Sequence, residues 1–118
     1  MVGKLIGAVL LLCAGSGVSA QAITVQEVLG WCEEFIDGRP SSFNKGICLG
    51  MVAGVGYMSG ANCSRLDEQY RRPLASDGNH STGAGVQAFV NWAHTHPEEW
   101  GMRAELGIAI SETFPCVD

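Results

Sequence analysis

The sequence predicts an all-α protein, a small four-helix domain stapled by two disulfides. Three observations lead to this class. Apolar residues recur at helical spacing in separate stretches of the chain. Residues that typically begin and end helices flank those stretches. The part of the chain that follows an export signal also holds an even number of cysteines, as disulfide-stapled domains do.

Residues 1–20 have the three parts of a secretory signal peptide. Lys4 is positive, residues 5–14 are apolar, and small residues precede the expected cleavage after Ala20, with cleavage after Ala22 as the alternative. The apolar run is shorter than the roughly 20 residues that a membrane-spanning helix needs. We therefore expect an exported chain without a stable membrane anchor.

The domain that remains, residues 21–118, carries a net charge of −6, because Lys4 leaves with the signal peptide. This charge argues against nucleic acid and anionic lipid as partners and favours a basic protein surface. The four remaining cysteines are Cys32, Cys48, Cys63 and Cys116. In a short exported chain such a set indicates disulfides, and no close pair of cysteines suggests a zinc site. A periplasmic or secreted bacterial protein is expected.

Four cysteines allow three pairings. Cys32 lies near the end of the first predicted helix and Cys48 near the start of the second, on the same side of the short 37–42 turn. We therefore expect Cys32 to pair with Cys48, which leaves Cys63 for Cys116.

The first predicted helix spans residues 24–36. Thr24 and Glu27 form a capping box at its start. Gly38 and Pro40 are expected to end it. Its apolar stripe consists of Val25, Val28, Leu29, Cys32, Phe35 and Ile36.

The second predicted helix spans residues 43–60. Nearly every position is apolar or small, so periodicity cannot separate a buried helix from a strand, and length favours the helix. Gly46, Gly50 and Gly54 lie four residues apart. We expect them to line a face on which a neighbouring helix approaches closely.

Two further helices are predicted near the end of the chain. The third spans residues 84–95, with Val86, Phe89, Val90 and Ala93 as its core stripe. Pro97 suits the first turn of a fourth helix over residues 97–114. The inward residues expected in the fourth helix are Met102, Leu106, Ala109, Ile110, Thr113 and Phe114.

The polar segment 64–82 is the predicted partner-binding surface. It lacks an apolar stripe and is longer than an ordinary connector, and such loops are often functional. A short helical turn is expected over residues 66–70. The candidate contacts are Arg65, Asp67, Glu68, Tyr70, Arg71, Arg72 and His80. A disordered linker is the alternative interpretation.

The sequence favours no enzyme, metal site or cofactor. The acidic pairs Glu33–Glu34 and Glu98–Glu99 are neighbours that point about 100° apart on a helix, so they cannot share one substrate atom. His94 and His96 are two residues apart and do not face each other on a helix. The four cysteines are expected to be used in disulfides.

Several motifs together resemble the Rap/Tai type of periplasmic immunity protein. They are the stretch 46–55 (GICLGMVAGV), Cys63, His96-Pro97-Glu98 and the closing Thr113-Phe114-Pro115-Cys116. The resemblance spans residues 25–116. Members of this helical family neutralise cell-wall amidases delivered by type VI secretion systems.

The resemblance implies a homodimeric, non-catalytic inhibitor of a peptidoglycan amidase. The family usually has a short turn after the cysteine that corresponds to Cys63, whereas residues 64–81 form a longer insertion here. Trp31, Trp92 and Trp100 lie off the predicted core faces and are candidates for a dimer surface, or they cover the edge of the core. The alternative function is that of a small periplasmic helical chaperone or stress protein.

Overall fold

The all-α class is confirmed by the computed structural model, which describes residues 22–40 and 42–117. Four helices run along this part of the chain: α2 (Val25–Ile36), α3 (Phe43–Arg65), α4 (Thr82–Thr95) and α5 (Leu106–Thr113), with the 3₁₀ turns η1 (Glu68–Tyr70) and η2 (Pro97–Glu99). The described residues contain no strand. The predicted signal peptide, residues 1–20, lies outside them.

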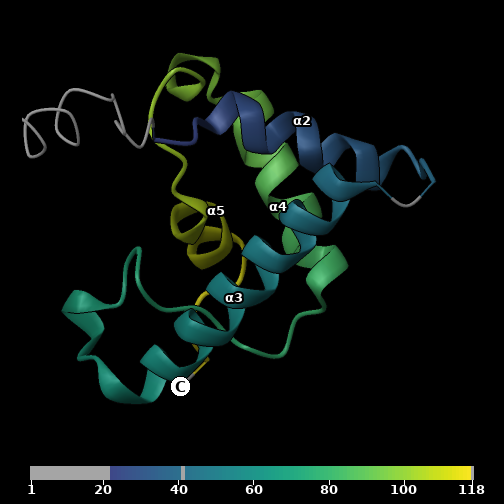
Figure 1. Cartoon of the computed structure of the whole chain (residues 1–118). Helices are drawn as coiled ribbons and strands as arrows, with labels where there is room; N and C mark the ends of the chain where they lie inside the picture. The colour runs from purple at the N-terminus through teal and green to yellow at the C-terminus, as the bar shows by residue number, and fades with distance from the viewer. Residues whose placement is uncertain (1–21, 41, 118) are drawn as a thin grey trace, which may run out of the picture.

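Helix α4 is at the centre of the core and packs against α2, α3 and α5 (Figure 1). The side chain of Phe89 is fully buried there. The other fully buried residues of the core come from all four helices and include Val28, Cys32, Cys48, Val52, Val86, Ala93, Ala109 and Ile110. The stripes predicted for the first and third helices therefore form most of the core.

Both predicted disulfides are confirmed. Cys32 pairs with Cys48, with 5.3 Å between their Cα atoms, and this bond joins α2 to α3 inside the core. Cys63 pairs with Cys116, with a Cα separation of 5.7 Å, and joins the last turn of α3 to the end of the chain.

Hydroxyl groups cap three helix starts. The Thr24 side chain accepts a hydrogen bond from the Glu27 amide at 3.2 Å, as the capping box predicts. Ser42 caps α3 in the same way. Ser81 accepts from the Ala84 amide at 3.1 Å, so α4 begins two residues earlier than predicted.

The predicted end of the second helix at residue 60 is wrong, because α3 continues to Arg65. Asparagine often ends a helix, because its side-chain amide competes for hydrogen bonds with nearby backbone groups. Here the Asn62 side chain donates instead to the carbonyl of Leu74, 2.9 Å away, and its own carbonyl accepts from the Leu66 amide. The residues after Gly60 therefore stay helical.

The predicted continuous helix over residues 97–114 is also wrong. It is divided into η2 and α5, with an irregular stretch over residues 100–105. The Val25 amide donates to the carbonyl of Met102 at 2.9 Å, and the Ala104 amide donates to Ile23 at 2.9 Å. These bonds to the start of α2 use backbone groups that a continuous helix would need.

Three residues expected to face the core are exposed. Ile36, the last residue of α2, is 39% exposed, and Met102 is 58% exposed because it lies in the stretch that interrupts the fourth helix. Thr113 is also exposed, at the end of α5.

The sequence left two roles open for the three tryptophans, a dimer surface or cover for the edge of the core. In the structure they cover the edge of the core. Trp31, Trp92 and Trp100 are partly buried and pack against the core residues. The Trp100 indole N–H also donates to the carbonyl of Ala93 at 2.8 Å. Their indole rings therefore already have contacts within the protein.

The glycine face expected at Gly46, Gly50 and Gly54 contacts no neighbouring helix: a Cβ added at any of these positions would meet nothing within 4 Å. The close approach occurs at other glycines. A Cβ on Gly85 of α4 would lie 2.7 Å from Cγ1 of the buried Val52. The expected role is therefore wrong for these three glycines, and Gly85 has it instead.

Substitution of glycine by alanine separates these two kinds of position. We expect Gly85→Ala to destabilise the protein by about 1–3 kcal/mol, because the added methyl overlaps a buried, β-branched side chain. Gly30→Ala, in open space on α2, is the matched control and stabilises by about 0.5–1 kcal/mol through lower backbone entropy in the unfolded chain. Urea unfolding of both variants measures the difference, and equal stabilities would contradict the proposed overlap.

Candidate functional site

The predicted binding segment extends from the helical body after α3 and returns to it before α4 (Figure 1). Its outer part, residues 67–72, is called the tip below. The predicted helical turn is confirmed as η1. All tip residues except the half-buried Arg71 are exposed, and Tyr70 is 58% exposed.

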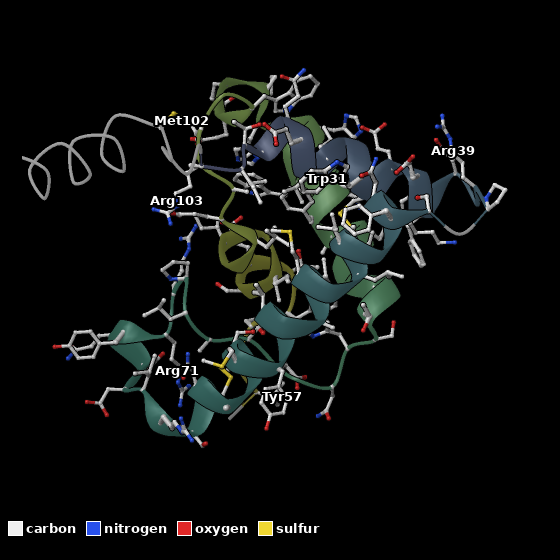
Figure 2. All side chains as sticks on the ribbon, in the orientation of Figure 1. Trp31, Arg39, Tyr57, Arg71, Met102 and Arg103 are labelled. Carbon is white, nitrogen blue, oxygen red and sulfur yellow. A yellow bond between two sulfur atoms is a disulfide. The ribbon has the colours of Figure 1, made fainter. Side chains whose placement is uncertain are left out.

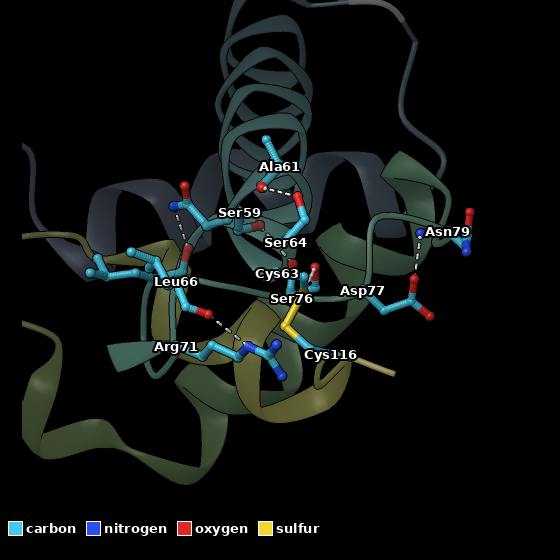
Figure 3. Close-up of a disulfide and its surroundings, with 12 residues drawn as sticks. Ser59, Ala61, Cys63, Ser64, Leu66, Arg71, Ser76, Asp77, Asn79 and Cys116 are labelled. Atoms are coloured by element: carbon cyan, nitrogen blue, oxygen red, sulfur yellow. Dashed lines mark hydrogen bonds between the residues drawn. A yellow bond between two sulfur atoms is a disulfide. The ribbon is translucent and has the colours of Figure 1, made fainter. Parts of the chain in front are cut away.

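The returning part of the segment, residues 73–77, is the base, and it is fixed to α3 (Figure 3). The hydroxyls of Ser59 and Ser76 are both buried and lie 2.6 Å apart. The Ser76 amide donates to the Ser59 carbonyl at 3.1 Å. Together with the bond from Asn62 to the Leu74 carbonyl, these contacts hold the base in one position. The base is thus bonded to α3 through both side-chain and backbone groups.

A second set of contacts joins the base to the end of the chain. The Asp77 amide donates to the carbonyl of Phe114 at 2.7 Å. The disulfide between Cys63 and Cys116 closes the same region covalently (Figure 3). Gly60 and Gly78 also meet here, since a Cβ on Gly60 would lie 3.0 Å from the Cα of Gly78.

His80 holds the end of the segment in place through two contacts. Its Nδ1 lies 2.7 Å from the carbonyl oxygen of Asp77, which can only accept, so this nitrogen carries the proton. The imidazole ring stacks on Phe114, with 4.3 Å between the centroids. Half-buried in this way, His80 has a structural role that the sequence interpretation missed.

The other candidate contacts lie together at the end of α3 and on the tip. Arg65, Asp67 and Glu68 are exposed. Arg72 forms an ion pair with Glu112 of α5. The Arg71 Nε donates to the Leu66 carbonyl at 3.2 Å, which braces the tip across its own turn (Figure 3). The tip thus presents mixed charge around one exposed aromatic ring.

An apolar groove with a volume of about 610 Å³ lies between α3, the base and the start of α5. Met51, Val55 and Met58 line its α3 side, and Leu74 and Ile108 line the other sides. The sequence interpretation missed this groove. A signal for it is the helical spacing of the three α3 residues, which form a stripe beside the buried Cys48 and Val52.

In the described part of the chain, no three histidine, cysteine or acidic side chains are grouped as ligands for a metal ion. None of the described helices combines the length and the apolar character that crossing a bilayer requires. The groups gathered at the site are hydrogen-bonding side chains, one exposed tyrosine and an apolar surface.

The chain was compared with protein-family models, with curated proteins and with solved structures. None of the three comparisons found a match. The resemblance to the Rap/Tai immunity proteins therefore stays an expectation from the motifs, and the function is argued from the site.

The two disulfides differ in the length of chain that they close, which is 16 residues for Cys32–Cys48 and 53 for Cys63–Cys116. In the chain-entropy model, replacing the first pair by alanine costs about 3 kcal/mol and replacing the second costs about 4 kcal/mol. Urea unfolding measures both losses. We also expect faster proteolysis within residues 66–81 in the Cys63→Ala/Cys116→Ala variant alone, and equal cleavage of the two variants would contradict the role of this bond in fixing the base.

Proposed function

We propose that this chain is an exported, non-catalytic protein of the periplasm that inhibits a peptidoglycan amidase by placing its tip in the active-site cleft of the enzyme. The single observation that carries the proposal is the tip itself, an exposed protrusion on a fixed base. Fixing the base before binding lowers the entropy that a loop loses on insertion. The motif resemblance supplies the class of enzyme, and a type VI secretion system is the expected source of that enzyme.

Charge and surface chemistry support a protein partner. The expected mature chain has a net charge of −6, which favours association with a basic enzyme and steers its approach. Tyr70 offers a rigid amphipathic side chain of the kind enriched at the centres of protein interfaces.

The alternative function, a chaperone or stress protein, differs in how it binds. A chaperone of this type binds many unfolded clients after loosening in acid, whereas an inhibitor forms a complex of fixed composition at neutral pH. Two disulfides oppose loosening of the described domain, and this favours the inhibitor.

The exposed ring of Tyr70 allows a direct test of the tip. We expect Tyr70→Ala to weaken binding to the amidase encoded beside this gene by at least about tenfold, roughly 1.4 kcal/mol, because the variant removes the exposed ring of the tip. Met102→Ala is the control, because Met102 is 58% exposed in the irregular stretch before α5 (Figure 2), away from the tip and from the proposed dimer face, and it leaves that affinity within about twofold. Calorimetric titration at neutral pH gives affinity and stoichiometry.

Replacement of residues 67–72 by a glycine–serine run of equal length extends the same test, because the base contacts and all four cysteines remain. Loss of inhibition with an unchanged unfolding midpoint supports the tip as the site. Unchanged inhibition would mean that the enzyme binds a helix face instead of the tip, and it would contradict this part of the proposal.

The proposal includes a homodimer, with α3 as its surface. Phe43 and Tyr57 are 82% and 80% exposed, and each lies seven residues from Gly50. The exposed residues between them, Asn44, Gly46, Gly50, Ala53 and Gly54, carry no charge. A two-fold axis at Gly50 would place Phe43 of each copy beside Tyr57 of the other, as an interface between identical copies requires.

A charge at the centre of this face tests the dimer. We expect the wild-type protein to have a dimer mass by light scattering at tens of micromolar and Gly50→Glu to have a monomer mass, since pairing would bury two like charges. Gly30→Glu, at an equally open glycine on α2, is the control and remains dimeric. A monomeric wild-type protein would contradict the dimer while leaving the inhibitor proposal intact.

A further inference from the structure

The groove between α3, the base and α5 differs in chemistry from the surface around it. Only one charged residue, Glu105, is among those that line it. The polar side chains at its wall are already used, since Asn62 bonds to the Leu74 carbonyl and Ser59 bonds to Ser76. The groove therefore offers apolar contacts without unsatisfied polar side chains, and its volume of about 610 Å³ is in the range of ligand sites.

Two large apolar side chains lie at the mouth of the groove. Met58 is 64% exposed on α3, and Leu74 is 55% exposed on the base. Exposed apolar side chains on opposite sides of one depression leave apolar surface in water that an inserted group would cover. Met58 can also adjust to the shape of that group, because its side chain is unbranched and flexible.

Glu105, the one charged residue of the groove lining, favours a positive charge at the groove. It is exposed and precedes α5, and its carboxylate makes no hydrogen bond or ion pair among the described residues. A cation bound beside the groove would pair with this carboxylate, whereas the carboxylate of a fatty acid would be repelled. The net negative charge of the whole chain acts in the same direction.

We propose that the groove binds a leucine-, phenylalanine- or tryptophan-sized side chain of the partner protein, with a lysine or arginine of the same partner paired to Glu105. This inference deepens the proposed function and rests on it. Pro73 and Leu74 connect the groove to the tip, since Pro73 follows the tip directly and both residues line the groove. A protein that receives the tip therefore also meets the mouth of the groove. Apolar anchors surrounded by polar contacts are the usual centre of such interfaces.

A dipeptide probe tests the groove without the amidase. N-acetyl-tryptophanyl-arginine amide is titrated into the protein while the methyl groups of Met58, Leu74 and Ile108 are followed by NMR. We expect saturable shifts at these methyls and at least about fivefold weaker binding of the tryptophanyl-glutamate analogue, because of Glu105. Shifts located elsewhere, or equal binding of the glutamate peptide or of octanoate, would overturn the proposed chemistry.

Matched variants test whether the dipeptide binds through the residues of the groove. Met58→Asp is expected to weaken binding of the arginine peptide at least about tenfold. Glu105→Gln is expected to make the arginine and glutamate peptides bind with equal affinity. Met102→Asp is the control for the first, because Met102 is 58% exposed and lies in the stretch before α5, outside the groove lining (Figure 2). Glu98→Gln on η2 is the control for the second. Controls that behave like the groove variants would overturn the inference.

The amidase then distinguishes failure of the two proposals. If the wild-type protein inhibits the enzyme and Met58→Asp weakens the complex at least about tenfold while Met102→Asp does not, the groove is part of the interface. If inhibition depends on Tyr70 but not on Met58, the proposed function stands and the proposal that the groove binds the partner is overturned. Absence of any amidase complex would overturn the function, and the occupant proposed for the groove with it, even if the dipeptide binds.

Discussion

The disulfide between Cys63 and Cys116 holds the part of the fold that the core does not reach. Beyond Ser59, none of the remaining α3 residues is buried, so the last turns of this helix gain little from apolar packing. Residues 114–117, the described residues after α5, are likewise exposed or half-buried. A domain of this size has few kcal/mol of net stability available, and a covalent closure supplies what packing does not. The base of the binding segment depends on this closure, because it is bonded to both joined elements.

Helix α3 contributes to three different surfaces of the protein. This explains why it consists mainly of apolar and small residues. One side, with Cys48 and Val52, is buried in the core, and an adjacent side, with Met51 and Met58, lines the groove. The third side contains the open glycines around Gly50. A helix with apolar or small residues on every side has little polar face, and an ordinary surface helix would not be built in this way. The exposed apolar surface of α3 is therefore what a partner, or a second copy, has to cover.

Most features set by residues close in sequence were predictable, and most features set by distant residues were not. The Cys63–Cys116 pair is the exception, because it followed once Cys32 was assigned to Cys48. The Thr24 cap and the Cys32–Cys48 pair follow from short-range patterns. The interruption of the last helix depends on hydrogen bonds between residues 23–25 and 100–104, and no local pattern reports these. The same holds for α3, whose extension depends on Asn62 reaching Leu74. In the candidate site, composition located the exposed tip, whereas the anchoring of Ser76 and the place of His80 required the folded chain.

A rigid base under an exposed tip favours tight binding for a thermodynamic reason. Each residue that must be ordered on binding costs free energy, about 1–2 kcal/mol for its backbone. Residues 73–77 are already ordered by Ser59, Asn62 and Phe114, so that cost is incurred on folding and not on association. The side chains of the tip still adapt, because most of them are exposed. The surface thus combines a fixed backbone position with adjustable contacts, and a protein that must enter an enzyme cleft needs both properties.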